Sequence, residues 1–295
     1  LDNRPSGKQY YGNAKGIWQT VYLEAREDLY ISGIFFTPDI DAAKVNIRLE
    51  LSTPAPAGTV FRLTGHWNAL GFEAPIQEGQ KEAEFSLDIP DMKLWSVEDP
   101  FLYEVTASVT SQESSDAVKT YFGMRKISVV PIPGKDFTYV ALNNKPLYLK
   151  LTLDQSYHPE GFYTFPSDQF MKEEIMRAKA LGLNGLRIHI KAEIPRKLYW
   201  ADKLGLLIME DVPNYWGEPT PEAKANWEYI AENEIKRDYN HPSIFSWVLF
   251  NETWGLFTKD PVSGRSVYTP ETQEWVRSWY RKTKEFDKTR LVEDN

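Results

Sequence analysis

Apolar and polar residues follow two different rhythms along the chain. Between about residues 20 and 130, apolar side chains alternate strictly with polar ones, a period of two that predicts half-buried strands. The alternating runs are 45–51, 83–89 and 103–109. Clusters of turn-forming residues, such as 53–58 and 111–116, separate them. This half of the chain is therefore predicted to be a β-sandwich.

The segment 130-VPIPGKD-136, rich in proline and glycine, is interpreted as the linker between two domains. After it, segment 167–182 has apolar residues at helical spacing, a cap at Ser167 or Asp168, and a glycine at its end. Segment 195–205 repeats this pattern. The second half is thus predicted to contain helices that alternate with strands.

Two further helices are expected to begin at Thr220–Pro221 and Thr269–Pro270, where a capping residue precedes a proline. The strands between helices are continuously apolar, at 147–153, 183–190, 206–211 and in the run that ends before Asn251. Such strands predict a parallel sheet buried on both faces, either open or closed as a barrel. At about 31 residues per unit of a (β/α)8 barrel, the remaining ~160 residues supply about five units. An open sheet would be complete, whereas a barrel would be cut short.

Composition narrows the class of partner. The length of 295 residues suits two domains. A formal net charge of -8 argues against nucleic acid, which usually meets a basic face. No apolar run approaches the ~18 residues of a membrane span, so no membrane partner is expected. The absence of cysteine excludes disulfides and thiolate metal sites, but leaves the compartment open between cytoplasmic and periplasmic or secreted.

Polar residues stand at the predicted carboxyl ends of these strands, where functional groups of parallel sheets converge. They are Asp154, Arg187, His189, Glu210, Asp211, Asn251, Glu252, Glu293 and Asp294. Each carboxylate alone is more often a solvated or loop-capping residue. Their recurrence at nearly every strand end is the stronger signal.

Carboxylates facing one cavity, with aromatic residues just beyond them, are what hydrolysis of a glycosidic bond requires. Glu252 is the candidate general acid, because partial desolvation beside Trp254 would raise its pKa. Asn251 could bind the sugar's 2-hydroxyl group, although a cap or turn role is the alternative. The aromatic candidates are Tyr215, Trp216 and Trp254.

The sequence gives little support to a catalytic metal. His158, His189 and His241 lack the short spacing of metal ligands, and a structural role is expected for His241 at the amino end of its strand. No phosphate-binding glycine pattern follows a strand, and no Gly-x-Ser-x-Gly motif occurs. No cofactor is therefore expected to be required, with room left for a structural or assisting cation.

The segment 236-KRDYNHPSIFSWVLFNE-252 resembles the region around the acid/base glutamate of glycoside hydrolase family 2, which contains β-galactosidases, β-glucuronidases and β-mannosidases. The segments 16-GIWQTVYLE-24, 94-LWSVEDPFLYEVTA-107 and 121-YFGMRKISV-129 are similar to that family's joins around its immunoglobulin-like domain. The likeness covers nearly the whole chain. It implies an immunoglobulin-like β-sandwich followed by an incomplete TIM barrel.

By this resemblance, residues 1–22 are the tail of a jelly-roll sugar-binding domain, 23–130 the sandwich and 131–295 the first five barrel units. Glu252 matches the general acid/base and Asn251 its partner. The chain is then expected to be part of a longer protein that acts on carbohydrate. A homo-oligomer of that protein is left open.

The resemblance also implies substrate contacts. Arg187 matches the family's barrel arginine, but 187-RIHIKAEIP-195 departs from the usual His-Tyr-Pro that follows it, which weakens the case for His189. The family's Asn-x-His-Glu is replaced by 152-TLDQSYHPEG-161, so Asp154 is a candidate sugar ligand without a family counterpart. The other candidate substrate contacts are Asp211 and Trp254.

The family's nucleophilic glutamate follows the seventh strand, which five units do not reach, and Glu293 in the fifth unit is not that residue. The chain alone is therefore expected to be inactive, while the whole protein hydrolyses a terminal β-linked sugar with retention, a galactoside being favoured. Two alternatives stay open. One is a non-catalytic carbohydrate-binding or adhesion protein, and the other is an open-sheet α/β domain joined to an immunoglobulin-like module.

Overall fold

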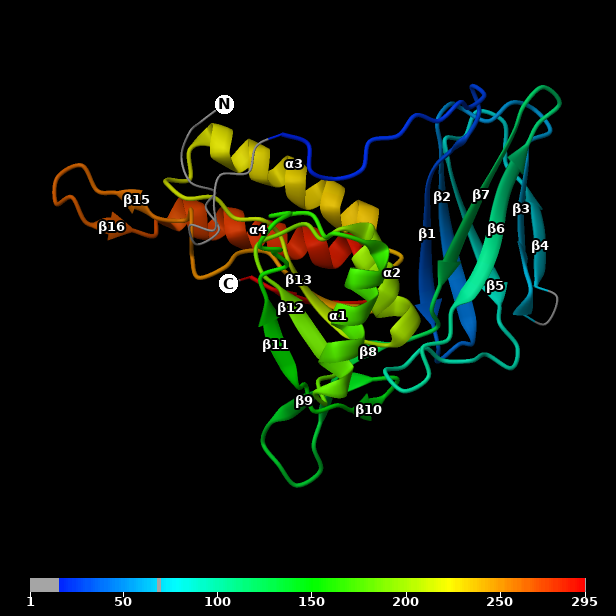
Figure 1. Ribbon diagram of the computed structural model, residues 1–295. Coiled ribbons are helices and arrows are strands. Elements are labelled where there is room, and N and C mark those ends of the chain that lie inside the picture. Colours follow the sequence, from blue (N-terminus) through cyan, green and yellow to red (C-terminus); the bar gives the residue numbers. More distant parts are fainter. Residues whose placement is uncertain (1–15, 68–69, 295) are drawn as a thin grey trace.

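The computed structural model describes residues 16–67 and 70–294, which form a β-sandwich and an α/β half (Figure 1). The sandwich packs two antiparallel sheets, ordered β1-β2-β5 and β4-β3-β6-β7. Their strands are β1 (Ile31–Asp39), β2 (Lys44–Leu51), β3 (Val60–Gly65), β4 (Gly71–Pro75), β5 (Glu82–Asp88), β6 (Tyr103–Thr110) and β7 (Ser115–Phe122). The predicted sandwich is confirmed.

The alternating residues build the sandwich core. Every second residue of β2 and of β6 is buried, and these residues join one apolar cluster that spans both sheets. Phe61 stacks on Phe85 and Tyr103 stacks on Phe122, each pair with ring centroids 4.9 Å apart. The alternating apolar residues of β5, an edge strand of its sheet, are only half-buried.

The segment interpreted as a linker, 130–136, has a different structure. It is the end and the loop of a hairpin between β8 (Ile127–Pro131) and β9 (Thr138–Leu142), and β10 (Lys145–Pro146) adds a third strand. Proline and glycine favour hairpin loops as strongly as linkers, so the pattern did not separate the two. This small sheet packs in one apolar cluster with Leu207 and Phe245, at the beginning of two parallel strands.

The α/β half contains a five-stranded parallel sheet in the order β11-β12-β13-β14-β17. The strands are β11 (Leu151–Asp154), β12 (Gly185–Ile188), β13 (Leu207–Asp211), β14 (Ile244–Val248) and β17 (Leu291–Glu293). Strand order follows chain order, as in a TIM barrel, whereas doubly wound sheets reverse direction at a switch point. The sheet is therefore the first five strands of a barrel, with β11 and β17 as its edges.

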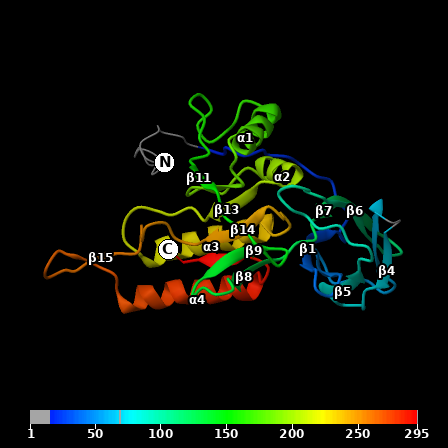
Figure 2. The same cartoon turned by 90° about the horizontal axis from the view of Figure 1, so that it is seen from below.

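Four helices follow these strands, and the predicted caps are present. They are α1 (Asp168–Ala180), α2 (Pro195–Leu204), α3 (Pro221–Asp238) and α4 (Pro270–Phe286). Ser167, Thr220 and Thr269 each accept a hydrogen bond from a backbone N–H in the first helical turn. Helices α3 and α4 lie side by side (Figure 2), and a short hairpin of β15 (Thr258–Lys259) and β16 (Ser266–Val267) precedes α4. No helix of the described residues is long and apolar enough to cross a membrane.

Arg125 fastens the sandwich to the amino-terminal edge of the parallel sheet. Its buried guanidinium donates to the carbonyl oxygens of Pro242, Ile244 and Thr289 at 2.9, 3.1 and 2.9 Å. These carbonyls lie at or just before the start of β14 and β17. The opposite, carboxyl-terminal edge is therefore left for the site. Residues 1–15, within the predicted jelly-roll tail, lie outside the described residues, and the two predicted domain boundaries stay predictions.

Candidate active site

Three strand ends of the barrel half are joined by one arginine. From β12, Arg187 donates from Nε and Nη2 to the two carboxylate oxygens of Asp211, the last residue of β13, at 2.9 Å each. Arg187 Nη2 also donates to Asn251 Oδ1, just after β14, at 2.9 Å. A bidentate arginine–carboxylate pair is both strong and directional. We call Arg187, Asp211 and Asn251 the clamp; it brings together three of the predicted site residues.

The clamp fixes the orientation of the Asn251 side chain. Asn251 is 2% exposed, and its backbone N–H donates to Asn214 Oδ1 at 2.9 Å. Because Arg187 holds Oδ1, Nδ2 is left as a donor, and it has no hydrogen-bond partner among the residues that the structure describes. A buried donor without a partner costs about 1–3 kcal/mol. Asn251 is thus held ready to donate to a ligand.

The backbone at this edge is strained. Ile190, Glu252 and Thr253 have φ angles of 50°, 51° and 59°, in the left-handed region that residues other than glycine rarely adopt. Each such residue costs of the order of 1–3 kcal/mol, and such strain concentrates at functional sites. Gly255 completes the turn after β14 with φ 75°, where a Cβ atom would lie 2.8 Å from the Tyr215 ring. The chain therefore changes direction sharply just where Glu252 stands.

Glu252 itself is exposed to solvent, which corrects the expectation of a half-buried acid. Trp254 lies instead against Trp216, with ring centroids 4.0 Å apart, and edge-on to His189 at 6.3 Å. Trp254 was expected to shield the Glu252 carboxylate, because the two residues are close in the sequence. The left-handed turn at Glu252 and Thr253 instead directs the two side chains differently. Trp216 is 60% exposed, so this aromatic pair presents a flat apolar surface to solvent.

Asp154, at the end of β11, lies in a different cluster of contacts. Its carboxylate accepts from Lys197 Nζ at 2.7 Å and from the Ser156 backbone N–H at 2.7 Å. Burial alone would raise the pKa of the adjacent Glu193, but Lys197 and Lys191 lower it to about 2. That Asp154 binds sugar stays a prediction, and its observed partner is a buried lysine.

His189 is 4% exposed, and its Nδ1 lies 3.1 Å from Gln155 Oε1; its role as a substrate contact also stays a prediction. His241, expected to be structural, has Nδ1 2.5 Å from Asp202 Oδ2 and 3.2 Å from the Tyr121 hydroxyl. These contacts connect β7 with α2 just before the start of β14, and none of them involves a residue of the clamp.

Sequence reasoning missed several buried charges. Lys191 and Lys197 are 2% and 1% exposed, and Glu234 and Asp238 of α3 are 4% and 0% exposed. One signal was available. Glu234 and Asp238 follow Trp227 at intervals of seven and eleven residues, which places two carboxylates on the buried face of α3.

Known sequences resemble this chain over large parts of its length. A β-galactosidase of Thermoanaerobacterium thermosulfurigenes is 33% identical over 174 residues, which cover 56% of this chain and 22% of that protein. A putative β-glucuronidase of Formosa agariphila is 30% identical over 57% of this chain and 16% of that protein. The chain thus spans about a fifth of the length of these curated relatives.

A solved structure gives the same picture. The GH2 β-galacturonidase of Eisenbergiella tayi, bound to galacturonate, matches with a TM-score of 0.73 and 25% identity over 90% of this chain and 46% of that one. Two family models match: glycosyl hydrolases family 2 over residues 29–125, and the TIM barrel domain of the same family over residues 135–294. With this barrel model covering more than half of its residues, the chain belongs to glycosyl hydrolase family 2.

Proposed function

We propose that this chain carries the acid/base half of the active site of a retaining, exo-acting β-glycoside hydrolase. The observation that carries the proposal is the clamp, which holds Asn251 rigidly at the end of β14 and thereby sets the start of the turn that bears Glu252. Family membership supports the same reaction class. The chain spans less than half of its relatives, so the proposal concerns the longer protein to which it belongs.

In this mechanism Glu252 protonates the glycosidic oxygen as the bond to the leaving group breaks, and then removes a proton from the water that releases the sugar. Asn251 Nδ2 donates to the sugar's 2-hydroxyl oxygen, a contact that strengthens at the transition state. The exposed position of Glu252 suits an acid whose cavity wall is completed by other barrel strands.

The nucleophile is proposed to come from a later strand of the longer protein. A retaining pair has its carboxyl groups about 5–5.5 Å apart. The strand-end carboxylates of Asp154 and Asp211 are each bound to a cation, Lys197 and Arg187. A nucleophile tied in this way would lose reactivity, so we assign neither residue to the role, and we expect the isolated chain to be inactive.

A neutral sugar, with a terminal β-galactoside as the first candidate, fits the strand ends better than a uronic acid. A uronate needs a cation free to pair with its carboxylate. Three cations near these strand ends, Arg187, Lys191 and Lys197, are each already paired with a carboxylate of the protein. The curated relatives include several named β-galactosidases.

The decisive variant is Glu252→Gln in the full-length protein. Loss of general acid assistance is expected to lower kcat/KM for an alkyl β-galactoside by about 10²–10⁴-fold. The loss should be much smaller for a dinitrophenyl β-galactoside, because that leaving group departs without a proton. Initial rates with both substrates, and with the matching glucuronide and galacturonide, test the reaction and the sugar together.

Glu222→Gln, an exposed carboxylate in the first turn of α3, is the matched control and should keep full activity. Equal losses for both leaving groups would contradict an acid role for Glu252. Sugar binding without any turnover that depends on Glu252 would instead support the carbohydrate-binding protein. Turnover by the isolated 295-residue chain would contradict the assignment of the nucleophile to a later strand.

A further inference from the structure

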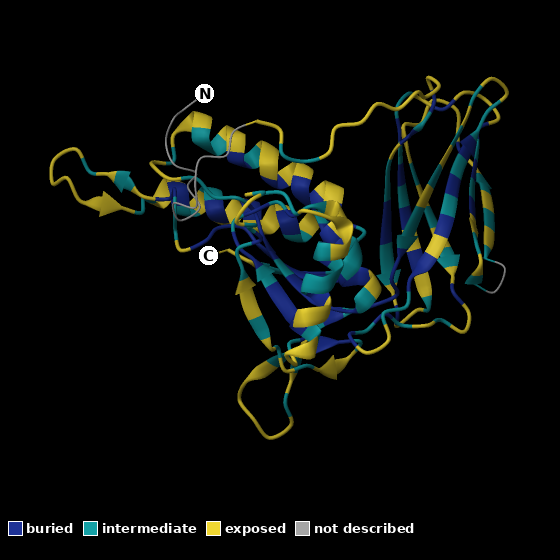
Figure 3. Cartoon of the chain, viewed as in Figure 1, coloured by how far each residue is buried: buried dark blue, intermediate teal, exposed yellow. Residues whose placement is uncertain are grey.

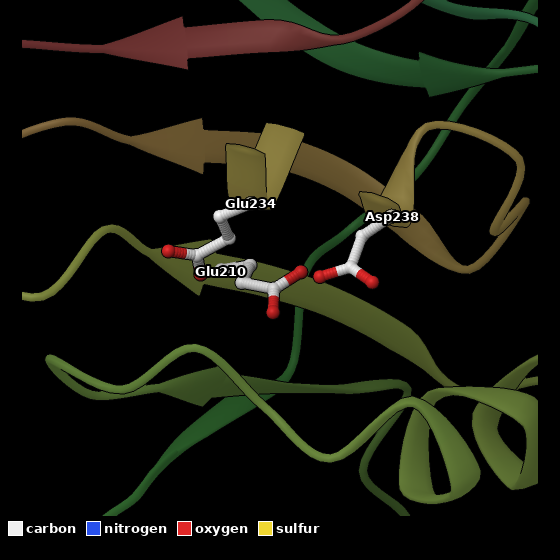
Figure 4. Close-up of side chains that lie close together, drawn as sticks. All are labelled: Glu210, Glu234 and Asp238. Carbon is white, nitrogen blue, oxygen red and sulfur yellow. The ribbon is translucent and has the colours of Figure 1, made fainter. Parts of the chain in front are cut away.

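Three buried carboxylates gather between β13 and α3, on the side of β13 that faces the helix (Figure 4). Glu210 comes from β13, and Glu234 and Asp238 from α3. One oxygen of each lies within 4.8 Å of the others. Glu210 and Asp238 are fully buried and Glu234 is 4% exposed. We call these residues the carboxylate trio.

Protein contacts do not satisfy the carboxylate trio. Arg237 donates to both oxygens of Asp238, at 2.8 and 2.5 Å. Glu210 Oε1 accepts from the Glu193 backbone N–H at 3.2 Å. Glu210 Oε2 and both oxygens of Glu234 have no hydrogen-bond partner within the described ranges 16–67 and 70–294. Two of the three carboxylates therefore have buried oxygens that no donor of the described residues satisfies.

Charge is also unbalanced there. Three ionised carboxylates beside one guanidinium leave a net charge of about -2, and an isolated buried carboxylate is very costly. Of the three carboxylates, Arg237 binds only Asp238, so a further positive charge at this place would balance Glu210 and Glu234.

We propose that the carboxylate trio binds one hard divalent cation, of the class of Ca²⁺, Mg²⁺ or Mn²⁺. Carboxylate oxygens are the ligands that these ions prefer, and the trio contains no nitrogen or sulfur that would favour zinc or copper. Each carboxylate oxygen has two lone pairs, so Asp238 can bind the ion while it holds Arg237. A charge of +2 balances the site.

The bound cation would tie α3 to β13 one residue before Asp211. Asp211 points to Arg187, whereas Glu210 points to α3. The cation would thus stabilise the position of β13, and with it the clamp, without touching substrate. This site is separate from the acid/base residue, and its test does not depend on the proposed glycosidase activity.

The test uses the full-length protein, stripped with EDTA and dialysed at neutral pH, and titrated separately with Ca²⁺, Mg²⁺ and Mn²⁺. Calorimetry should show saturable binding of one ion at the carboxylate trio. At about 100 times the dissociation constant, the unfolding midpoint of this domain should rise by about 5–10 °C. The three titrations identify which ion fits.

Glu234→Gln keeps the shape of the side chain but removes the charged ligand, and should weaken ion binding by at least tenfold. Loss of a hydrogen bond that merely supports a ligand already lowers metal affinity by about tenfold or more. Glu232→Gln is the matched control, since Glu232 is exposed on the same helix and pairs with Lys282. Saturable binding that is unchanged in Glu234→Gln would place the ion elsewhere and overturn the proposal. No binding of any of the three ions to the unaltered protein would overturn it as well, and would mean that protons neutralise the trio.

Discussion

The sandwich and the barrel half both contain buried residues (Figure 3), but these residues differ in kind. Among the described residues of the sandwich, 31–67 and 70–122, Thr59 is the single buried residue that is polar or charged. The barrel half buries whole ion pairs, including Arg290 with Asp287 and Lys191 with Glu193. In the sandwich, the pair of Arg62 and Glu73 remains at the surface.

This contrast shows how the two halves divide their roles. Apolar burial stabilises a fold without demanding particular partners, because the hydrophobic effect is not directional. Buried ion pairs add little net stability, but they hold side chains in one geometry. The half that carries the candidate active site is therefore the half that buries charge.

Among the variants that test this difference between the halves, Arg290→Met is expected to lower the free energy of unfolding the most. Arg290 is 2% exposed and donates to Asp287 and to the carbonyl oxygens of Tyr239, His241 and Ile244. Its loss leaves Asp287 buried without a charge partner, which should lower the free energy of unfolding by about 3–5 kcal/mol. Chemical denaturation followed by tryptophan fluorescence measures the change.

The sandwich offers the matched control, Arg62→Met. Its partner Glu73 lies at 2.7 Å, but both side chains are largely exposed, so the cost should be at most about 1 kcal/mol. Similar losses for the two variants would show that the halves do not differ in how they use charge.

Acid should unfold the barrel half first. Burial alone would raise the pKa of Asp287, but Arg290 and hydrogen bonds from Trp247 and Thr289 lower it below its usual value. A lowered pKa adds stability above the unfolded-state pKa of about 4, and this stability is lost as pH falls through the folded-state pKa. Hydrogen exchange between pH 5 and 2.5 should show amide protection lost in β14 and α4 before β2 and β6.

Asp287→Asn should flatten this pH dependence in the barrel half, although the variant is less stable at neutral pH. If the sandwich strands lose protection first, or if the slope is the same in Asp287→Asn, then Asp287 is not the group that responds to acid.

The smallest effect is expected from Thr269→Ala. The Thr269 hydroxyl accepts from the Thr272 backbone N–H at 3.2 Å, and removing such a cap typically costs about 1 kcal/mol. Thr269→Ser keeps the acceptor and should restore most of the stability, as measured by thermal unfolding. A loss of the same size in both variants would mean that packing of the methyl group, and not the cap, stabilises α4.

The sequence predicted secondary structure correctly wherever a few adjacent residues determine it. The alternation in 45–51 and 103–109 predicted β2 and β6, and Thr220 and Thr269 predicted the starts of α3 and α4. The hairpin at 130–136 was not predicted, because proline and glycine specify a change of direction without specifying what pairs on either side.

The candidate site was predicted in part. The pattern brought Arg187, Asp211 and Asn251 to one edge of a parallel sheet, since carboxyl ends of parallel strands meet there, but it did not predict that the three bind one another. The exposure of Glu252 depends on the left-handed turn after Asn251, and the pairing of Asp154 with Lys197 joins two elements 43 residues apart.

By itself, the sequence determined the period of each element, the positions of the caps and the polar residues that end each strand, because these depend on neighbours within about one helical turn. Only the tertiary structure decided the order of the parallel strands, the partners of each buried charge and the meeting of Glu210, Glu234 and Asp238. A carboxylate looks the same in the sequence whether it faces water, an arginine or two other carboxylates, and its surroundings in three dimensions decide its energy and its chemistry.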